Sequence, residues 1–201
     1  GFPEGRSLKE LTRILGEEGV EVNARVLPAL HPDAARRYLD ARVQILYPNG
    51  AYADAYKEFF EPLAIRTVTL GAPYGLEATA AWVEGAASAL GMKARGRAIA
   101  ASARKTESPN WAGARREAAG RGVAFVVDAF HLARLTDPAQ MWGIPALRIL
   151  KEMGFGVHVL CYGQGAKEAP GLAYFQAPSE LERLLKEGPF QAVYSEYAFD
   201  S

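Results

Sequence analysis

The chain has 201 residues, 49% of them apolar, so it can bury the core of one large domain or two small ones. Its 23 basic and 23 acidic residues cancel, which gives no reason to expect nucleic acid or an anionic membrane as a partner. The single cysteine, Cys161, excludes an intramolecular disulfide and a four-cysteine metal site built within the chain. No apolar run is long enough to span a membrane and no signal peptide is visible, so we expect a cytoplasmic protein.

Hydrophobic periodicity predicts alternating helices and strands in the first half of the chain. The first helix follows a capping box, Ser7 to Glu10, and a longer helix follows the loop Gly71 to Gly75 and stops at Gly91. The predicted elements are helix 7–15, strand 20–26, a short helix ending at Leu39, strand 43–47, helix 51–60, strand 65–70 and helix 76–90.

The stretch 93–121 is strongly basic and reads as a helix with a break near Pro109, followed by a boundary. It has a single aromatic residue, Trp111, so a solvated helix face is a simpler interpretation than a nucleic-acid site. Beyond it, Asp137 and a second capping box at Ser179 predict helix starts. The predicted elements are strand 122–128, helix 138–153, strand 156–160, helix 180–187 and strand 192–194.

This order predicts an α/β fold with two Rossmann-like halves and mainly parallel sheets. We expect a first domain at residues 1–92, a basic helical connector at 93–121 and a second domain at 122–201, whose completeness stays open. In such sheets, ligands bind beyond the carboxyl ends of the strands.

The residues at those strand ends are the candidate cofactor-binding residues. The three histidines of the chain are scattered along it and show no metal-ligand spacing. The helix start after Gly75 can bind an anion, although Glu77 would oppose one, and a plain βα turn is the alternative. A solvated loop residue is the alternative for His131, and a buried apolar role is the alternative to a reactive thiol for Cys161. The candidates are Asn49, Gly50, Tyr52, Pro73, Tyr74, Gly75, Asp128 and His131.

Three segments resemble a known family. Residues 70–83 (LGAPYGLEATAAWV), 7–23 (SLKELTRILGEEGVEVN) and 146–159 (ALRILKEMGFGVHV) are similar in order and spacing to nitrogenase component 1-like proteins. These include the nitrogenase MoFe subunits and the dark-operative protochlorophyllide and chlorophyllide reductases. The resemblance implies stacked Rossmann-like domains, homo- or hetero-oligomers with a related subunit, and electron delivery by an ATP-dependent iron–sulfur reductase. It also implies a tetrapyrrole or metallocofactor bound between domains, beside the loops at Asn49, Gly50 and Tyr52 and from Pro73 to Gly75.

The chain departs from the family pattern in two places. A nitrogenase cofactor-ligating cysteine would fall near residues 48–50, where there is none, so the resemblance does not extend to a subunit that holds the FeMo-cofactor. The stretch 129–143 is longer than in the family, which puts the loop roles of the second half in doubt. The family's cluster cysteines lie mostly in an N-terminal domain that this chain lacks, so we expect a fragment or truncated member. We expect it to hold no cofactor alone, with an iron–sulfur cluster only where missing segments or a partner supply ligands.

Three functions remain open at this point. The first is a subunit, or subunit fragment, of a nitrogenase-like oxidoreductase that binds a tetrapyrrole or metallocofactor. The second is a non-catalytic cofactor-binding or assembly module of the same fold. The third is an unrelated two-domain Rossmann-type transferase, for which the sequence offers no motif. Whether the chain is an enzyme stays open as well.

Overall fold

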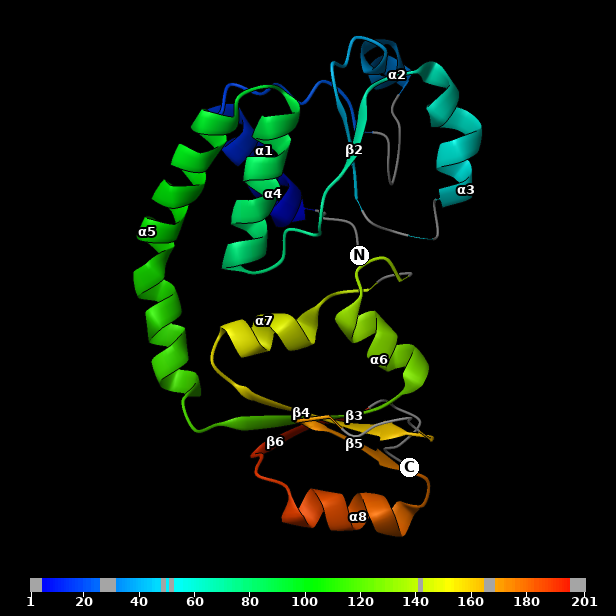
Figure 1. The fold of residues 1–201 in the computed structure, drawn as a ribbon, viewed down its shortest axis with the longest axis vertical. Helices are drawn as coiled ribbons and strands as arrows, with labels where there is room; N and C mark the ends of the chain where they lie inside the picture. The colour runs from blue at the N-terminus through cyan, green and yellow to red at the C-terminus, as the bar shows by residue number, and fades with distance from the viewer. Residues whose placement is uncertain are drawn as a thin grey trace. The chain divides into compact units, whose positions relative to one another are not determined.

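The computed structural model describes residues 5–25, 32–47, 50, 53–140, 143–164 and 169–195. The chain forms two compact units (Figure 1). Unit 1 comprises Gly1–Ser108 and Pro138–Trp142, and unit 2 comprises Pro109–Asp137 and Gly143–Ser201. The boundary falls inside helix α5 (Lys93–Ala118) and inside the connector predicted at 93–121. Helices alternate with strands, and the strands pair in parallel, which confirms the predicted α/β class.

Unit 1 is built around a two-stranded parallel sheet of β1 (Gln44–Leu46) and β2 (Thr67–Thr69), in which Leu46 lies opposite Thr69. The strand-to-strand connection contains α3 (Ala53–Ala55), the π-helical turn η2 (Tyr56–Phe60) and the 3-10 turn η3 (Glu61–Leu63). The remaining helices of the unit are α1 (Gly5–Glu17), α2 (Pro32–Tyr38), α4 (Leu76–Ala89) and the first part of α5.

The core of unit 1 joins α1 to α4. Leu11 and Leu15 of α1 are buried against Trp82, Val83 and Ala86 of α4, because each helix presents its apolar residues at a spacing of three and four. Both helices end in a glycine-terminated motif. Gly19 and Gly91 have φ of 75° and 79°, and the residue after each donates its amide to the carbonyl five positions earlier. These sharp ends let the chain turn back onto the core.

Glu18, at the end of α1, is the one polar residue among the buried residues described. Its side chain is fully buried and neither carboxylate oxygen has a hydrogen-bond partner among the described residues. It lies where α4 and α5 approach closely: a Cβ on Gly96 would come within 2.4 Å of the Cβ of Ala87 and 3.5 Å of the Glu18 Oε1. Burial raises the pKa of Glu18, and the nearby Arg95 guanidinium lowers it by less. The ionised carboxylate therefore destabilises the folded state.

We predict that Glu18→Met stabilises the protein at pH 7, because methionine fills a similar volume without a buried charge. The native pKa is raised, so the penalty is full above that pKa, shrinks as the pH falls, and is gone below the unfolded value of 4.5. Chemical denaturation across pH measures this. The control Glu17→Met, at an exposed neighbour, should change stability by less than about 0.5 kcal/mol. A Glu18→Met variant less stable than wild type at pH 7 would show that the carboxyl is stabilising.

Unit 2 is a four-stranded parallel sheet in the order β5-β4-β3-β6. Its strands are β3 (Gly122–Asp128), β4 (Gly156–Tyr162), β5 (Leu172–Phe175) and β6 (Ala192–Ser195). Its helices are the end of α5, α6 (Ala129–Thr136), α7 (Ala146–Glu152) and α8 (Pro178–Glu187). The central strands β3 and β4 are nearly continuous apolar runs, as expected for strands covered on both faces.

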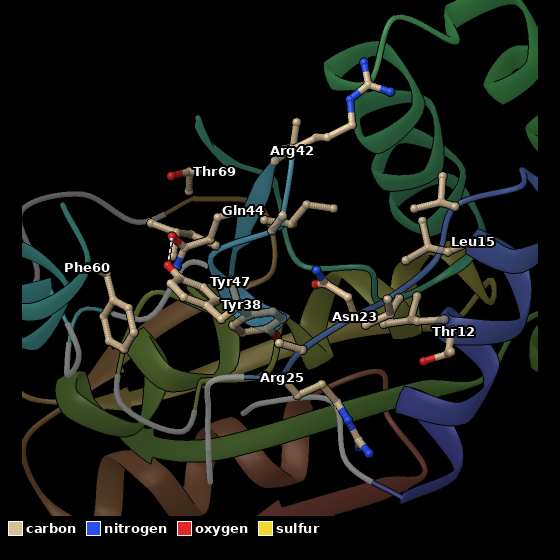
Figure 2. A pocket seen from close by; sticks show the side chains of 18 of the residues that line it. Thr12, Leu15, Asn23, Arg25, Tyr38, Arg42, Gln44, Tyr47, Phe60 and Thr69 are labelled. Atoms are coloured by element: carbon tan, nitrogen blue, oxygen red, sulfur yellow. Dashed lines mark hydrogen bonds between the residues drawn. The ribbon is translucent and has the colours of Figure 1, made fainter. Parts of the chain in front are cut away.

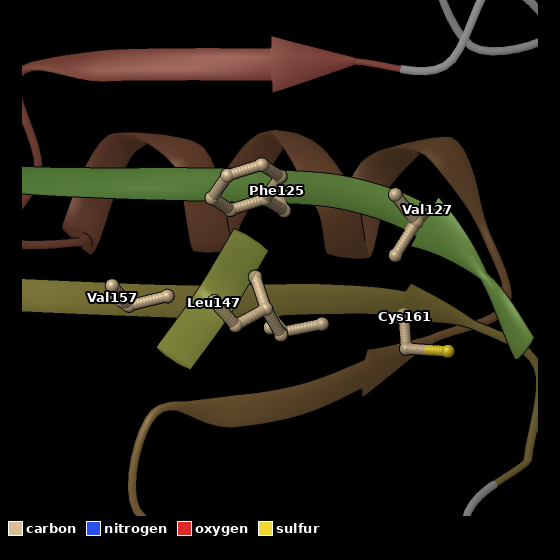
Figure 3. Close-up of a cluster of buried hydrophobic side chains, with 6 residues drawn as sticks. Phe125, Val127, Leu147, Val157 and Cys161 are labelled. Carbon is tan, nitrogen blue, oxygen red and sulfur yellow. The ribbon is translucent and has the colours of Figure 1, made fainter. Parts of the chain in front are cut away.

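Alternate residues of the central strands supply two separate cores. Phe125 and Val127 of β3 and Val157 and Cys161 of β4 pack with Leu147 of α7 on one face (Figure 3). On the other face, Val126, Leu160 and Phe175 pack against Leu181, Leu184 and Leu185 of α8. The sheet is therefore sandwiched between helices, and Cys161 is a buried member of an apolar core.

Two predicted elements of the first half and connector are wrong. Residues 20–25 form no strand, because periodicity does not supply a ladder partner: the Val20 amide bonds the Leu15 carbonyl and the Asn23 amide group bonds the Arg37 carbonyl. The helix α5 continues through Pro109. Pro109 removes one backbone hydrogen bond from a part of the helix whose residues 105–110 are exposed to solvent.

Helix starts are also misplaced. Helix α1 begins at Gly5, so Ser7 is not its cap. Asp137 ends α6 instead of opening a helix, and α7 starts only after Pro145. In α8 the N-cap is Ala177, and the Glu180 carboxylate accepts the amides of Gln176 and Ala177. Strand β5 has no counterpart among the predicted elements.

Candidate functional site

A cavity of about 1100 Å³ opens within unit 1 beside the two-stranded sheet. Its walls come from α1, the segment 20–25, α2, β1 and the η2 turn. Figure 2 shows Thr12 and Leu15 of α1 on one side and Phe60 on the other. Most of the wall is apolar or aromatic, and Trp82 closes part of it. A space of this size and character is typical of a site for a large, mainly apolar ligand.

Three tyrosines line the cavity, and two of them are held by the sheet. The Tyr38 hydroxyl donates to Gln44 Oε1 at 2.7 Å, and the Tyr56 hydroxyl donates to Thr67 Oγ1 at 2.9 Å. Both acceptors are the first residues of their strands. These contacts fix the aromatic rings in the wall.

The third tyrosine, Tyr47, lies where β1 ends, next to the loop that follows β2. Burial raises the pKa of the Tyr47 hydroxyl, and hydrogen bonding to Tyr74 raises it further. Tyr47 therefore remains a neutral hydroxyl at physiological pH. The contact between Tyr47 and Tyr74 follows from the strand pairing. The Leu70 amide donates to the Leu46 carbonyl, so the residues that follow β1 lie near those that follow β2.

The loop Gly71 to Gly75 is held tightly to the start of α4. Gly75 has φ of 84° and occupies the N-cap, where it offers no side-chain acceptor. The Thr79 hydroxyl donates to the carbonyls of Gly75 and Pro73, at 2.7 and 3.1 Å. Glu77 in the first turn is paired with Arg104 Nε at 3.0 Å, which offsets the charge expected to oppose an anion there.

A second set of predicted residues lies at the carboxyl end of the unit 2 sheet. Asp128 Oδ1 accepts the His131 backbone amide at 2.8 Å and lies 2.8 Å from His131 Nδ1. The backbone hydrogen bond from His131 is the main cause that holds the pKa of Asp128 below its usual value. Burial, and then the Asp128 charge, raise the pKa of Cys161, so this thiol is not activated. Asp128 is therefore the N-terminal cap of α6, and its carboxylate accepts the amide of His131 in the first turn.

We predict that Asp128→Ala destabilises unit 2 by about 1 kcal/mol, because α6 loses its cap. The lowered pKa means that this stabilisation is present above the unfolded pKa, near 3.8, and is lost as the pH falls through the folded value. Urea unfolding at several pH values measures the effect. The difference between variant and wild type should shrink in acid. Asp54→Ala, in another short helix, should leave the unfolding of unit 2 unchanged. A variant as stable as wild type at pH 7 would contradict the capping role.

The structure brings some of the predicted residues together. Gly50 and Pro73 line the cavity, Gly50 is held by its amide to the Ala139 carbonyl at 2.6 Å, and Tyr74 lies against Tyr47. Asn49 and Tyr52 lie outside the described residues. Asp128 and His131 belong to unit 2 and do not line this cavity. The cofactor-binding role predicted for all eight residues stays a prediction.

Sequence reasoning missed most of the polar wall of the cavity. Four cationic residues line it together with Tyr38 and Gln44, and they come from segments that no local motif connects. Two carboxylates, Glu21 and Asp40, line it too. The cationic residues are Arg25, Arg37, Arg42 and Lys57.

Neither a metal-ion cluster nor a membrane-spanning helix is found in the part of the chain that the structure describes. No group of three or more His, Cys, Asp or Glu side chains there is placed to hold a metal ion. The helices described are too short or too polar to cross a membrane.

The chain matches the family model of nitrogenase component 1 type oxidoreductases over residues 1–197. It belongs to this family. Among curated proteins, none matches the chain. Two solved structures of nitrogenase Cp1 share the fold of this nitrogenase component 1 type chain. The one at pH 6.5 is 11% identical with a TM-score of 0.52, over 77% of this chain and 28% of that chain. The one at pH 5 is 13% identical with a TM-score of 0.54, over 90% of this chain and 36% of that chain.

The chain thus spans about a third of the length of those nitrogenase Cp1 chains. The family resemblance seen in three short segments of the sequence is confirmed by a family match that covers residues 1–197 of this chain. At these identities the structural likeness establishes the fold alone.

Proposed function

We propose that this chain is the ligand-binding part of a nitrogenase-like oxidoreductase and that it binds a tetrapyrrole in the cavity of unit 1. The observation that carries the proposal is the cavity of about 1100 Å³ beside the sheet in a member of this family. Ligand pockets usually enclose about 300–1,000 Å³, so a macrocycle fits the available space. Trp82, Tyr38 and Phe60 supply aromatic surface to the wall, with which a planar ring could pack.

The donor chemistry of the wall favours a tetrapyrrole over a metallocofactor. Clusters of iron and other soft metals are held by thiolate or imidazole ligands. The described residues that line the cavity include neither cysteine nor histidine, and the carboxylates among them are Glu21 and Asp40. A tetrapyrrole needs no protein ligand to bind, because its own nitrogens hold a metal where one is present.

Within this site, we assign Tyr47 the task of presenting a neutral hydroxyl group at the carboxyl end of the sheet, where Tyr74 contacts it. Because burial keeps Tyr47 protonated, it can hydrogen-bond an oxygen or nitrogen of the ligand without changing charge. The rigid attachments of Tyr38 and Tyr56 to the strands keep the wall in place. Reduction of the ligand would need electrons from an iron–sulfur reductase and a related subunit, as in the family; this chain would provide the binding surface.

A non-catalytic binding or assembly module is the second candidate. It is favoured by the lack of a metal-ligand group among the described residues. Reduction of the bound tetrapyrrole, when a reduced iron–sulfur protein is added, would separate an enzyme subunit from such a module.

We predict that the protein binds a metal-free porphyrin, with a shift of its main absorption band and an increase in melting temperature. At a hundred-fold excess over Kd, the stabilisation is about 2.7 kcal/mol. Thr12→Trp, which places an indole into the cavity from α1, should weaken binding at least ten-fold. Thr106→Trp, the same change at an exposed position of α5, is the matched control and should bind as wild type.

Absorption titration and thermal denaturation of the three proteins test this proposal. No spectral shift and no stabilisation of the wild-type protein would overturn it. Equal loss of binding in both tryptophan variants would place the site elsewhere.

A further inference from the structure

The carboxyl group of Glu18 is enclosed at a closely packed junction of α1, α4 and α5. Its side chain is fully buried, and neither oxygen has a hydrogen-bond partner among the residues that the structure describes. The packing leaves little space, since a Cβ on Gly96 of α5 would lie 3.5 Å from Glu18 Oε1 and 3.4 Å from the Cα of Glu84 in α4. A carboxyl without partners can stay in such a place while it is neutral, whereas its ionised form is strongly disfavoured there.

A cationic side chain lies close to Glu18 without bonding its carboxylate. Arg95 of α5 donates through Nη2 to the Glu17 carbonyl at 2.7 Å, at the end of α1. Its Nη1 would be 3.3 Å from a Cβ placed on Gly19, the residue that follows Glu18. Arg95 is exposed, whereas Glu18 is buried. The guanidinium group thus offers an ionised Glu18 carboxylate a cation and water directly outside the junction.

The other charged groups on these elements are paired or exposed. Glu84 of α4 accepts Arg104 Nη1 at 3.1 Å, and Glu17 is paired with Arg13 of α1. Burial raises the pKa of Glu18, and the charge of Arg95 lowers it by less. Arg95 is therefore the cation that favours ionisation of Glu18, against the effect of the junction. Exposed charged residues at the ends of α1 and α5 are Glu21, Lys93 and Arg97.

The end of α1 leads directly into the wall of the unit 1 cavity, which residues 19–25 line. The Gly19 amide donates to the Gly16 carbonyl and the Val20 amide to the Leu15 carbonyl, both at 2.9 Å. These two bonds fix the direction in which the chain leaves the helix. Residues 20–25 belong to no helix or strand, so no ladder holds them in place. A displacement of Glu18 would therefore be passed on to the cavity wall.

We propose that Glu18 is a proton-operated latch for this wall. The neutral carboxyl stays in the junction and holds the end of α1 against α4 and α5. The ionised carboxylate, having released its proton to water, leaves the junction for the Arg95 guanidinium and draws the segment 19–25 outward. The latch goes beyond the proposed function and does not depend on which ligand the cavity binds.

The direction of the pH dependence follows from the two positions of the carboxyl. In the closed position the pKa of Glu18 is raised, whereas in the open position, in water beside a cation, it lies near or below its ordinary value of 4.5. Between these two values the open form binds one proton fewer, so the opening equilibrium grows by up to about ten-fold per pH unit. Above the pKa of the closed form the opening no longer increases. The latch therefore opens as the pH rises.

Hydrogen exchange of the full chain between about pH 5 and 8 tests the latch. After correction for the ordinary increase of exchange rates with pH, protection of the Gly19 and Val20 amides should fall as the pH rises. The fall should level off at the pH at which the carbon-13 signal of the Glu18 carboxyl titrates. The amides of Gln44 and Leu70, which bond the carbonyls of Arg66 and Leu46 in the β1–β2 sheet, should change less.

Variants of the two residues and a matched control locate the effect. In Glu18→Gln, which has nearly the same shape and no ionisable group, protection at Gly19 and Val20 should no longer depend on pH. Glu17→Gln, at the exposed neighbour, should keep the wild-type dependence. In Arg95→Gln the fall should begin at a higher pH, because the ionised carboxylate has lost its cation, and Arg95→Lys should restore it. Circular dichroism checks that each variant is folded.

Each remaining outcome would overturn the latch. Protection at Gly19 and Val20 that does not change with pH in the wild-type protein would do so, even if Glu18→Gln failed to fold. A fall that persists in Glu18→Gln would assign it to another group. An equal fall at Gln44 and Leu70 would show unfolding of the whole unit instead of a local opening. An unchanged response in Arg95→Gln would exclude Arg95 as the group that receives the carboxylate.

Discussion

Parallel pairing of β1 with β2 is the constraint on which the site of unit 1 depends. Because Leu46 lies opposite Thr69, the chain leaves both strands at the same edge, and Tyr47 meets Tyr74 there. The same pairing sets the first residues of the strands side by side, where Gln44 and Thr67 hold Tyr38 and Tyr56. Two short strands thus position three tyrosines from separate segments, Tyr38, Tyr47 and Tyr56, around one cavity.

Both units contain a parallel sheet, but the two sheets differ in size and in packing. The sheet of unit 2 is longer, is covered by helices on both faces, and has a closely packed core from Phe125 to Cys161. At its carboxyl edge, Asp128 caps helix α6 by accepting the His131 amide. Unit 1 has the smaller sheet and a cavity of about 1100 Å³, and burial raises the pKa of its carboxyl group at Glu18.

The sequence was sufficient to predict the elements whose signal is local. Gly122–Asp128 is an unbroken apolar run and forms the central strand, and α4 begins and ends where Gly75 and Gly91 indicate. It was insufficient where tertiary contacts decide. Alternating residues after α1 found no strand partner, and α5 continues through Pro109.

The cavity shows the same limit more clearly. Gly50 and Pro73 could be named in advance because ligands bind at the ends of parallel strands. Arg25, Arg37 and Arg42 could not, because each lies in a segment with no motif, and only the folded chain brings them to one wall. Thus two residues of the cavity wall could be predicted from the order of elements, whereas the charged residues of that wall could not.

Hydrogen exchange of the full chain, measured with and without a saturating porphyrin, tests the central claim most directly, because it reports where the ligand binds. Ligand binding in unit 1 predicts slower exchange in residues 20–25 and 42–47, which line the cavity, and unchanged exchange in β3 and β4 of unit 2. Protection confined to unit 2, or a saturated complex without protection in those two segments, would contradict the account.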